Sequence, residues 1–192
     1  MTKYNSKGYI SIICLLIGSS VIALSLSIMS LHVNDYYLQQ SSFHRVKAQY
    51  LAESAFILTM HNLFLWSEDA INTYIDMAND KNKTAPLLEV HLEKHFIQKL
   101  SSMENEISKQ MKEAFSEYEH EHGFDVSISV STDRKTLIIN VHGYYENARV
   151  FLEGRAKMPL IVNEHHKSEE GLDVMIIQAL YLESLVQGYP KI

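Results

Sequence analysis

The strongest pattern in the sequence is an apolar run near its N-terminus. Residues 9–31 contain thirteen Leu, Ile, Val and Met side chains and no Asp, Glu, Lys, Arg or Pro. As an α-helix this run is about 35 Å long, which exceeds the ~30 Å hydrocarbon core of a bilayer. Each large aliphatic residue favours insertion by roughly 0.3–0.6 kcal/mol, and the serines in the run oppose it more weakly. The pattern predicts a transmembrane segment, which we place at 9–33.

Helical spacing continues beyond this segment. Phe43, Val46, Tyr50 and Ile57 recur at helical intervals, and neither Gly nor Pro occurs in residues 19–85. We therefore expect one long helix over 9–63, whose outer half at 34–63 packs its apolar face on another element.

A helical region is expected at 64–123. Ser67 is followed by two acidic residues and is a candidate N-cap for a short helix that ends near Met77. Thr84, with Pro86 in the first turn, is the candidate N-cap of a longer helix that ends at Gly123. The apolar residues of this longer helix follow steps of three and four: Leu92, Phe96, Leu100, Met103, Ile107, Met111 and Phe115.

The hydrophobic period changes to two at Phe124. From there to Ser131, apolar residues alternate with Asp and Ser, which is typical of a strand with one buried face. After a turn at 132–135, residues 136–145 and 148–158 predict two further strands, with Gly143 as a candidate bulge. We expect a three-stranded antiparallel meander at 124–162.

The tail at 163–192 predicts a loop and a C-terminal helix that ends at Gly188 and Pro190. This helix either packs on the rest of the domain or binds a partner. The apolar positions that predict it are Leu172, Met175, Ile176, Ala179, Leu182 and Val186. Together the elements indicate an α+β fold.

Charges on either side of the apolar run predict its orientation. Lys3 and Lys7 are the only charged side chains before it, and Asp35 is the first after it. Under the positive-inside rule the N-terminus is cytoplasmic, and the domain after the run is extracytoplasmic. A cleaved signal peptide is disfavoured because the run is longer than a typical h-region and no A-x-A-like site follows it. We expect a single-pass protein of the cytoplasmic (inner) membrane.

The N-terminal residues resemble the leader of the prepilin family. Lys7-Gly8-Tyr9 precedes the apolar run, as the leaders of type IV pilins and pseudopilins precede theirs. The resemblance implies a leader at 1–8, cleavage by a prepilin peptidase between Gly8 and Tyr9, and N-methylation of Tyr9. Ile13 departs from major pilins, which carry Glu at that place. This departure resembles minor pilins of the PilX type and the pseudopilins of competence and secretion systems.

A second stretch supports the same resemblance. Tyr50, Ala52, Glu53 and Ser54 are similar to the aromatic, Ala, Glu and small residues that close the first helix of PilX-type proteins. The family implies a pilin-like fold, in which a sheet lies on the outer half of the first helix. It also implies a minor subunit that starts filament assembly or sits at the filament tip, with the pilus at the cell surface as a further location. The implied partners are other pilin or pseudopilin subunits, the pilus assembly platform and membrane lipid.

Small residues form a stripe within the membrane segment. Ser19, Ala23 and Ser27 recur every four residues, and Gly18 recurs with Ser11 and Ser25 every seven. Small side chains at these intervals let helices approach closely in lipid. The alternative is that the serines bond only to their own helix.

The remaining chemistry argues against several classes of function. The net charge is −6 and no basic face is present, so we expect no direct nucleic-acid binding. Cys14 is the only cysteine, which excludes an internal disulfide. No nucleophile elbow, phosphate-binding glycine loop or paired-cysteine motif occurs, so we expect no enzyme and no cofactor.

The ten histidines are the candidate metal ligands that stand out in the sequence. His91 and His95 are four residues apart, but the intervening sequence lacks the Glu that a zinc protease places after its first His. We interpret them as part of a solvated helix face and expect no metal site. The rival to the pilin hypothesis is a permanent single-pass membrane protein with an extracytoplasmic sensing or binding domain.

Overall fold

The computed structural model describes residues 6–79, 86–167 and 173–188, with side chains described at 12–79, 86–162 and 176–188. Helices α1 and α2 precede strands β1 to β6. The chain divides into two compact units, residues 1–43 and 44–192. The first unit is the beginning of α1, and the second holds the rest of α1 and every other element. The α+β class is confirmed.

Helix α1 is Ser6–Asn79, a single helix that is longer than the predicted 9–63. The separate short helix expected after Ser67 is wrong. The Ser67 hydroxyl donates a hydrogen bond to the Phe64 carbonyl, 2.8 Å away, so it bonds within a helical turn and does not cap one. With neither Gly nor Pro in residues 19–85, nothing in the sequence stops the helix at 63.

Helix α2 is Leu88–Ala114. The expected N-cap, Thr84, lies outside the described residues, and Leu87 occupies the cap position without a side-chain hydrogen bond. The helix ends nine residues before the predicted Gly123, because Phe115 and Tyr118 turn inward and pack edge to face, with ring centroids 5.2 Å apart. The predicted apolar stripe is confirmed, since its members are buried or pack on the core: Leu92, Phe96, Leu100, Met103, Ile107, Met111 and Phe115.

The alternating segment forms the strands expected of it. β1 is His122–Val130, β2 is Thr136–Tyr145 and β3 is Ala148–Lys157, all paired antiparallel. The turn between β1 and β2 has Arg134 at a φ of 57°, and the Asp133 carboxylate accepts a hydrogen bond from the Lys135 amide.

The tail corrects two predictions, because it contains strands where a C-terminal helix was expected. β4 is Leu160–Lys167, β5 is Asp173–Gln178 and β6 is Tyr181–Gly188. β6 pairs with β3, so the main sheet has four strands in the order β1-β2-β3-β6, and the expected meander is only part of it. β4 and β5 form a second, two-stranded sheet.

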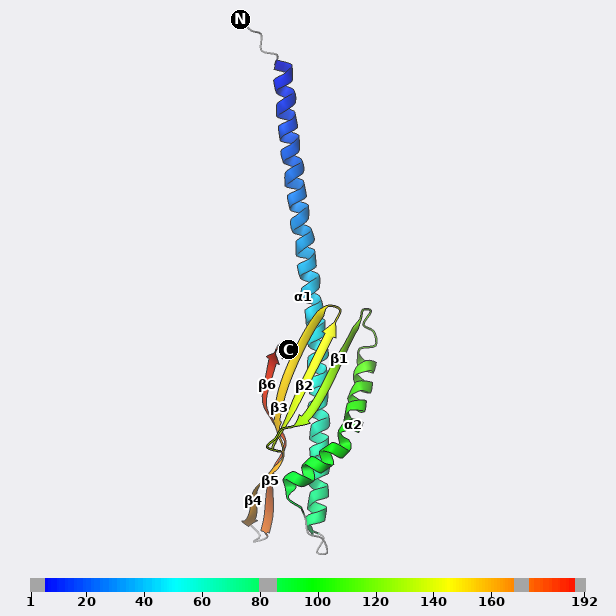
Figure 1. The fold of residues 1–192 in the computed structure, drawn as a ribbon, viewed down its shortest axis with the longest axis vertical. Coiled ribbons are helices and arrows are strands. Elements are labelled where there is room, and N and C mark those ends of the chain that lie inside the picture. Colours follow the sequence, from blue (N-terminus) through cyan, green and yellow to red (C-terminus); the bar gives the residue numbers. More distant parts are fainter. Residues whose placement is uncertain (1–5, 80–85, 168–172, 189–192) are drawn as a thin grey trace. The chain divides into compact units, whose positions relative to one another are not determined.

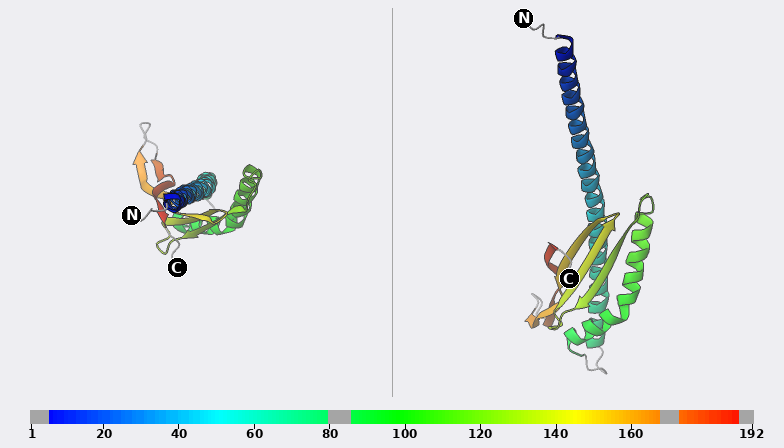
Figure 2. Two further views of the ribbon diagram at one scale, coloured as in Figure 1. Left: turned by 90° about the horizontal axis from the view of Figure 1, so that it is seen from above. Right: turned by 45° about the horizontal axis from the view of Figure 1, so that its top comes forward.

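The helical spacing in the tail was misleading because β-sheet partners decide its structure. Of the residues that suggested the helix, Leu172 lies outside the described residues, and the others lie in β5, in β6 or between them. The path β3-β4 pairs with the path β5-β6 as one long hairpin, which is interrupted at Pro159, a residue without a backbone N–H. Figures 1 and 2 show the β4–β5 part continuing beyond the end of the main sheet.

In the second unit, α1 lies on one face of the four-stranded sheet, and α2 lies beside β1 (Figure 1). Small residues let α1 approach the sheet closely. A Cβ added at Gly143 would lie 2.5 Å from the Ala48 carbonyl oxygen and 2.6 Å from the Ala52 nitrogen. Gly143 pairs regularly with Phe124 and Val150, so the predicted bulge there is wrong. Glycine is required at this position because the helix backbone occupies the space a side chain would need.

Candidate functional site

The first unit supplies an apolar anchor. Within the described residues, α1 is the one helix long and apolar enough to cross a membrane. Its large aliphatic side chains from Ile12 to Val33 are all exposed. The protein therefore has one N-terminal helix suited to a single membrane crossing.

The small residues of the anchor are satisfied by their own helix. The Ser19 hydroxyl donates to the Leu16 carbonyl, and the Ser27 hydroxyl donates to the Ala23 carbonyl, each at 2.9 Å. A Cβ at Gly18 would meet nothing within 4 Å. In the single chain the serines thus follow the self-bonded alternative. Ser19, Ala23 and Ser27 share one side of the helix, whereas Gly18 lies on another, about 180° around the axis from Ser27. Ile13 lies on the same helix and is 38% exposed, whereas Gly8 and Tyr9 lie in its first turns, where side chains are not described.

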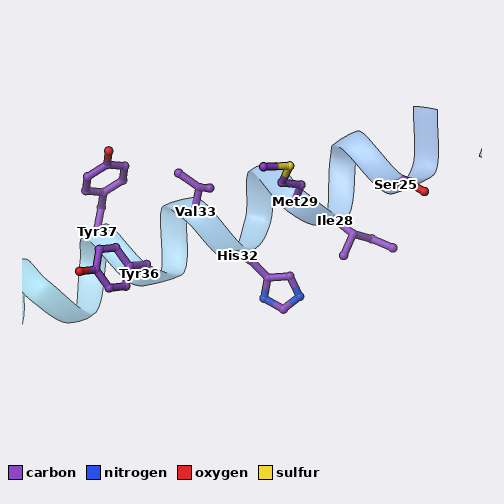
Figure 3. Close-up of a pocket in the computed structure, with 7 residues that line it drawn as sticks. All are labelled: Ser25, Ile28, Met29, His32, Val33, Tyr36 and Tyr37. Carbon is purple, nitrogen blue, oxygen red and sulfur yellow. The ribbon is translucent and has the colours of Figure 1, made fainter. Parts of the chain in front are cut away.

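Aromatic residues follow the anchor's apolar segment. Figure 3 shows His32, Tyr36 and Tyr37 on the helix surface beside Met29 and Val33. The two tyrosine rings pack edge to face at 6.1 Å. These side chains surround a shallow hollow whose lining residues all belong to α1. It is therefore an open helix surface and not an enclosed pocket. Tyrosine is enriched where membrane meets water, so this position suits the end of a membrane segment.

In the second unit, α1 carries an uncovered apolar stripe. Val46, Tyr50, Ile57 and Phe64 are 47, 57, 68 and 41% exposed. At 100° per residue these four side chains lie within one narrow sector of the helix. The buried residues of this stretch lie on the opposite side: Ala48, Leu51, Ala52, Ala55, Thr59, Leu63 and Trp66. Ala48 and Ala52 meet the sheet at Gly143, and Trp66 packs on Phe96 of α2 with ring centroids 5.3 Å apart. The helical spacing of this stripe is confirmed, but the prediction that it packs on another element is wrong, because its side chains are exposed.

The residues that resemble the family motif are divided between the buried and the exposed side of α1. Ala52 is fully buried against the sheet at Gly143, while Tyr50 belongs to the uncovered stripe. Glu53 accepts a hydrogen bond from the Gln49 side chain at 2.7 Å, and Ser54 is half-buried. The stretch therefore has one side chain on the sheet contact and one on the open face.

A lysine that sequence reasoning missed fixes α1 to the sheet. Lys47 Nζ donates a hydrogen bond to Tyr145 Oη at 3.0 Å and lies 5.0 Å from the Tyr118 ring centroid. Around Tyr145 the rings of His44 and His122 lie 5.3 and 6.4 Å away, centroid to centroid. No sequence signal could have linked Lys47 to Tyr145, because 98 residues separate them.

The histidine pair on α2 faces α1, which corrects its assignment to a solvated helix face. His91 Nε2 is 3.0 Å from the Ala70 carbonyl oxygen, and His95 Nε2 is 3.5 Å from an Asp69 carboxylate oxygen. Burial lowers the pKa of His95, and Asp69 opposes this effect. Among the residues whose side chains are described, no group of three or more His, Cys, Asp or Glu is arranged to hold a metal ion.

The sheet face opposite α1 is hollowed, and both polar and apolar side chains line it. The hollow has a volume of about 1190 Å³, and all four strands of the main sheet contribute to it. His142 stacks on Phe151 at 4.2 Å and lies 3.3 Å from an Asp125 carboxylate oxygen. Arg155 is paired with Glu153 at 3.0 Å, so charges at this surface compensate one another.

Comparisons with known proteins found no relative of this chain. No known protein family matches it, and neither a curated protein nor a solved structure matches it significantly.

Proposed function

We propose that the chain is a minor pilin or pseudopilin, a structural subunit that helps to start assembly of a type IV pilus-like filament or sits at its tip. The observation that carries the proposal is the uncovered stripe of Val46, Tyr50, Ile57 and Phe64. It belongs to the same helix as the membrane-length apolar segment. A stripe of this kind is what a helix needs if it is to pack against neighbouring helices after assembly.

The energetics favour covering this stripe. Fully burying a large apolar side chain contributes about 1.5–3 kcal/mol, so the half-exposed residues would each contribute on the order of 1 kcal/mol. In the bilayer the small residues of the anchor, among them Ser19 and Ala23, allow close approach of a second helix. Assembly would exchange the lipid contacts of the anchor for helix contacts and would remove the stripe from water.

The resemblance at the N-terminus adds the processing step. Cleavage after Gly8 by a prepilin peptidase would free Tyr9 for N-methylation. Ile13 places no carboxylate in the apolar segment, and an unpaired charge there would be costly in lipid. A subunit at the tip has no neighbour above it with which to pair such a charge, so Ile13 suits that place.

The test compares two equally apolar surface positions in the cells that make the protein. Ile57→Asp introduces a charge into the stripe, and Ile97→Asp introduces one on α2, where the side chain is 64% exposed. We expect Ile57→Asp to lower recovery of the chain in sheared filaments at least tenfold and Ile97→Asp to leave it unchanged. Mass spectrometry of the native chain should give an N-terminus at Tyr9. Retention of residues 1–8 with equal behaviour of the two variants would overturn the proposal.

A permanently anchored extracytoplasmic binding domain is the second candidate function. The hollow on the open face of the sheet favours it, because its volume and its mixed apolar and polar lining could hold a ligand. This candidate requires an N-terminus at Met1 or Thr2, so the same mass spectrum distinguishes the two functions.

A further inference from the structure

Strand β6 is an open edge of the main sheet. In the order β1-β2-β3-β6, β6 pairs with β3 on one side, and the described residues give it no pairing partner on the other. The opposite edge differs, because α2 lies beside β1 (Figure 1). An edge strand presents a row of unpaired N–H and C=O groups, which is a template for another strand.

The sequence of β6 lacks the usual protection of an edge. Tyr181–Gly188 contains no Lys, Arg or Pro. A register shift near Arg155 and Ala156 disturbs the start of its pairing, but Ser184 to Gly188 pairs regularly with β3. Leu185 and Val186 project to opposite faces of the sheet and are 47 and 57% exposed. The regular part of this edge therefore offers both backbone hydrogen bonds and apolar contacts.

We propose that the open edge of β6 at residues 184–188 binds an extended strand of a different protein chain. Main-chain hydrogen bonds would supply the affinity, as in other cases of strand addition, and alternate side chains would supply the specificity. Glu183 is the only charged residue of β6, and Lys157 Nζ already pairs with it at 3.4 Å. Charge complementarity at this edge thus favours a partner strand that is uncharged and apolar on both faces.

A second copy fits this edge less well. In Figure 1, β6 runs alongside the part of α1 that belongs to the second unit. Antiparallel pairing of two β6 strands would therefore make the two α1 helices run in opposite directions. Copies anchored in one membrane by the same helix run in the same direction, so two copies could pair only as parallel strands. Parallel pairing is the slightly less stable arrangement per residue, so a different chain is the better occupant.

A pair of proline variants tests the edge at the level of single hydrogen bonds. In an antiparallel strand the N–H groups of successive residues alternate between the two sides, so one of Leu185 and Val186 points its N–H away from β3. Proline is tolerated where the N–H faces outward and costs stability where it faces β3. Of Leu185→Pro and Val186→Pro, the variant that keeps the melting temperature of the full chain identifies the outward position.

Cross-linking in native membranes then reports the partner. Gln187, which is exposed, is replaced by the photoreactive residue p-benzoylphenylalanine in the full chain. We expect one discrete adduct with another protein, reduced at least tenfold by the outward-facing proline. The control is Thr132→Pro at the second position of the Ser131–Arg134 turn, which favours proline. This control should leave the adduct unchanged.

Three results would overturn strand addition at β6: no adduct, an adduct that the outward-facing proline leaves intact, or an adduct of the chain with itself. An open edge would serve a pilus subunit and a permanently anchored domain alike. The N-terminal mass spectrum and the Ile57→Asp comparison therefore fail or succeed independently of this experiment.

Discussion

At the scale of single residues, glycine and alanine decide how closely α1 meets the sheet. Gly143 faces the helix backbone at Ala48 and Ala52, whereas Gly154 faces the Phe56 ring. A ring can rotate away from an added methyl group, but a helix backbone can move only with its neighbours. The two glycines of the inner sheet face therefore differ in what a substitution would cost.

Gly143→Ala should destabilise the second unit by roughly 1–3 kcal/mol, the usual cost of overpacking a tight contact. Gly188→Ala is the matched control, because an added Cβ there meets nothing within 4 Å. Denaturant unfolding of the full chain in detergent measures both variants through Trp66, the only tryptophan, which is buried. Equal stability of the two variants would mean that the close contact at Gly143 is absent.

At the scale of elements, two of the polar contacts that hold α1 in place are made by its own charged side chains. Lys47 joins it to β2 through Tyr145, and Asp69 joins it to α2 through His95. Lys99 also lies 3.7 Å from Asp69, so this carboxylate faces both a histidine and a lysine. The second contact depends on pH because one of its members is a histidine.

Acid should weaken the contact between α1 and α2. Burial lowers the pKa of His95 below its ordinary value, and the nearby His91 and Lys99 lower it further, against the attraction of Asp69. The unfolded chain consequently binds a proton more readily than the folded chain. The stability that neutral His95 contributes is present above the ordinary histidine pKa of about 6.5 and is lost as the pH falls toward the lower folded value.

We expect the melting temperature of the native chain to fall between about pH 7.5 and pH 5, and His95→Gln to reduce that fall. His61→Gln, an exposed histidine on α1, should leave the fall unchanged. Thermal melts followed by circular dichroism at several pH values measure the difference. Identical pH profiles for all three proteins would show that His95 is not the responsible group.

At the scale of the whole molecule, the single helix α1 contributes residues to both units of the chain. Its first part is apolar on every side, and its later part is apolar on two opposite faces, of which one is covered by the sheet and by α2. Suitability for membrane insertion and folding of the second unit therefore depend on different residues of α1, so each property can be altered separately.

Val21→Arg should reduce membrane integration without unfolding the second unit. An arginine near the centre of a membrane helix costs roughly 2.5–3.5 kcal/mol for insertion. We expect a smaller fraction of the variant to resist alkaline extraction from membranes. The control is Val162→Arg, at an exposed position of β4, which should be extracted like the native chain. Normal integration of Val21→Arg would contradict a membrane position for residue 21.

The sequence alone determined the features that depend on local periodicity. The apolar run has no charge over its length, so its character does not depend on any partner, and the alternation from Phe124 gave β1, β2 and β3 within a few residues. The stripe of α2 was also recovered, because each member is large and apolar. These signals are local, and local signals survive without knowledge of the fold.

Only the tertiary structure decided which contacts the remaining residues make. The small residues Ala48 and Ala52 face the sheet because Gly143 lies opposite them, while the larger Val46 and Ile57 are left in solvent, which hydrophobicity alone would have reversed. The tail forms β6 because β3 offers it a paired edge, although Leu182 and Val186 stand at helical spacing. Long-range pairing overrides local pattern in such segments because a strand is stabilised by its neighbours, and those neighbours are distant in the sequence.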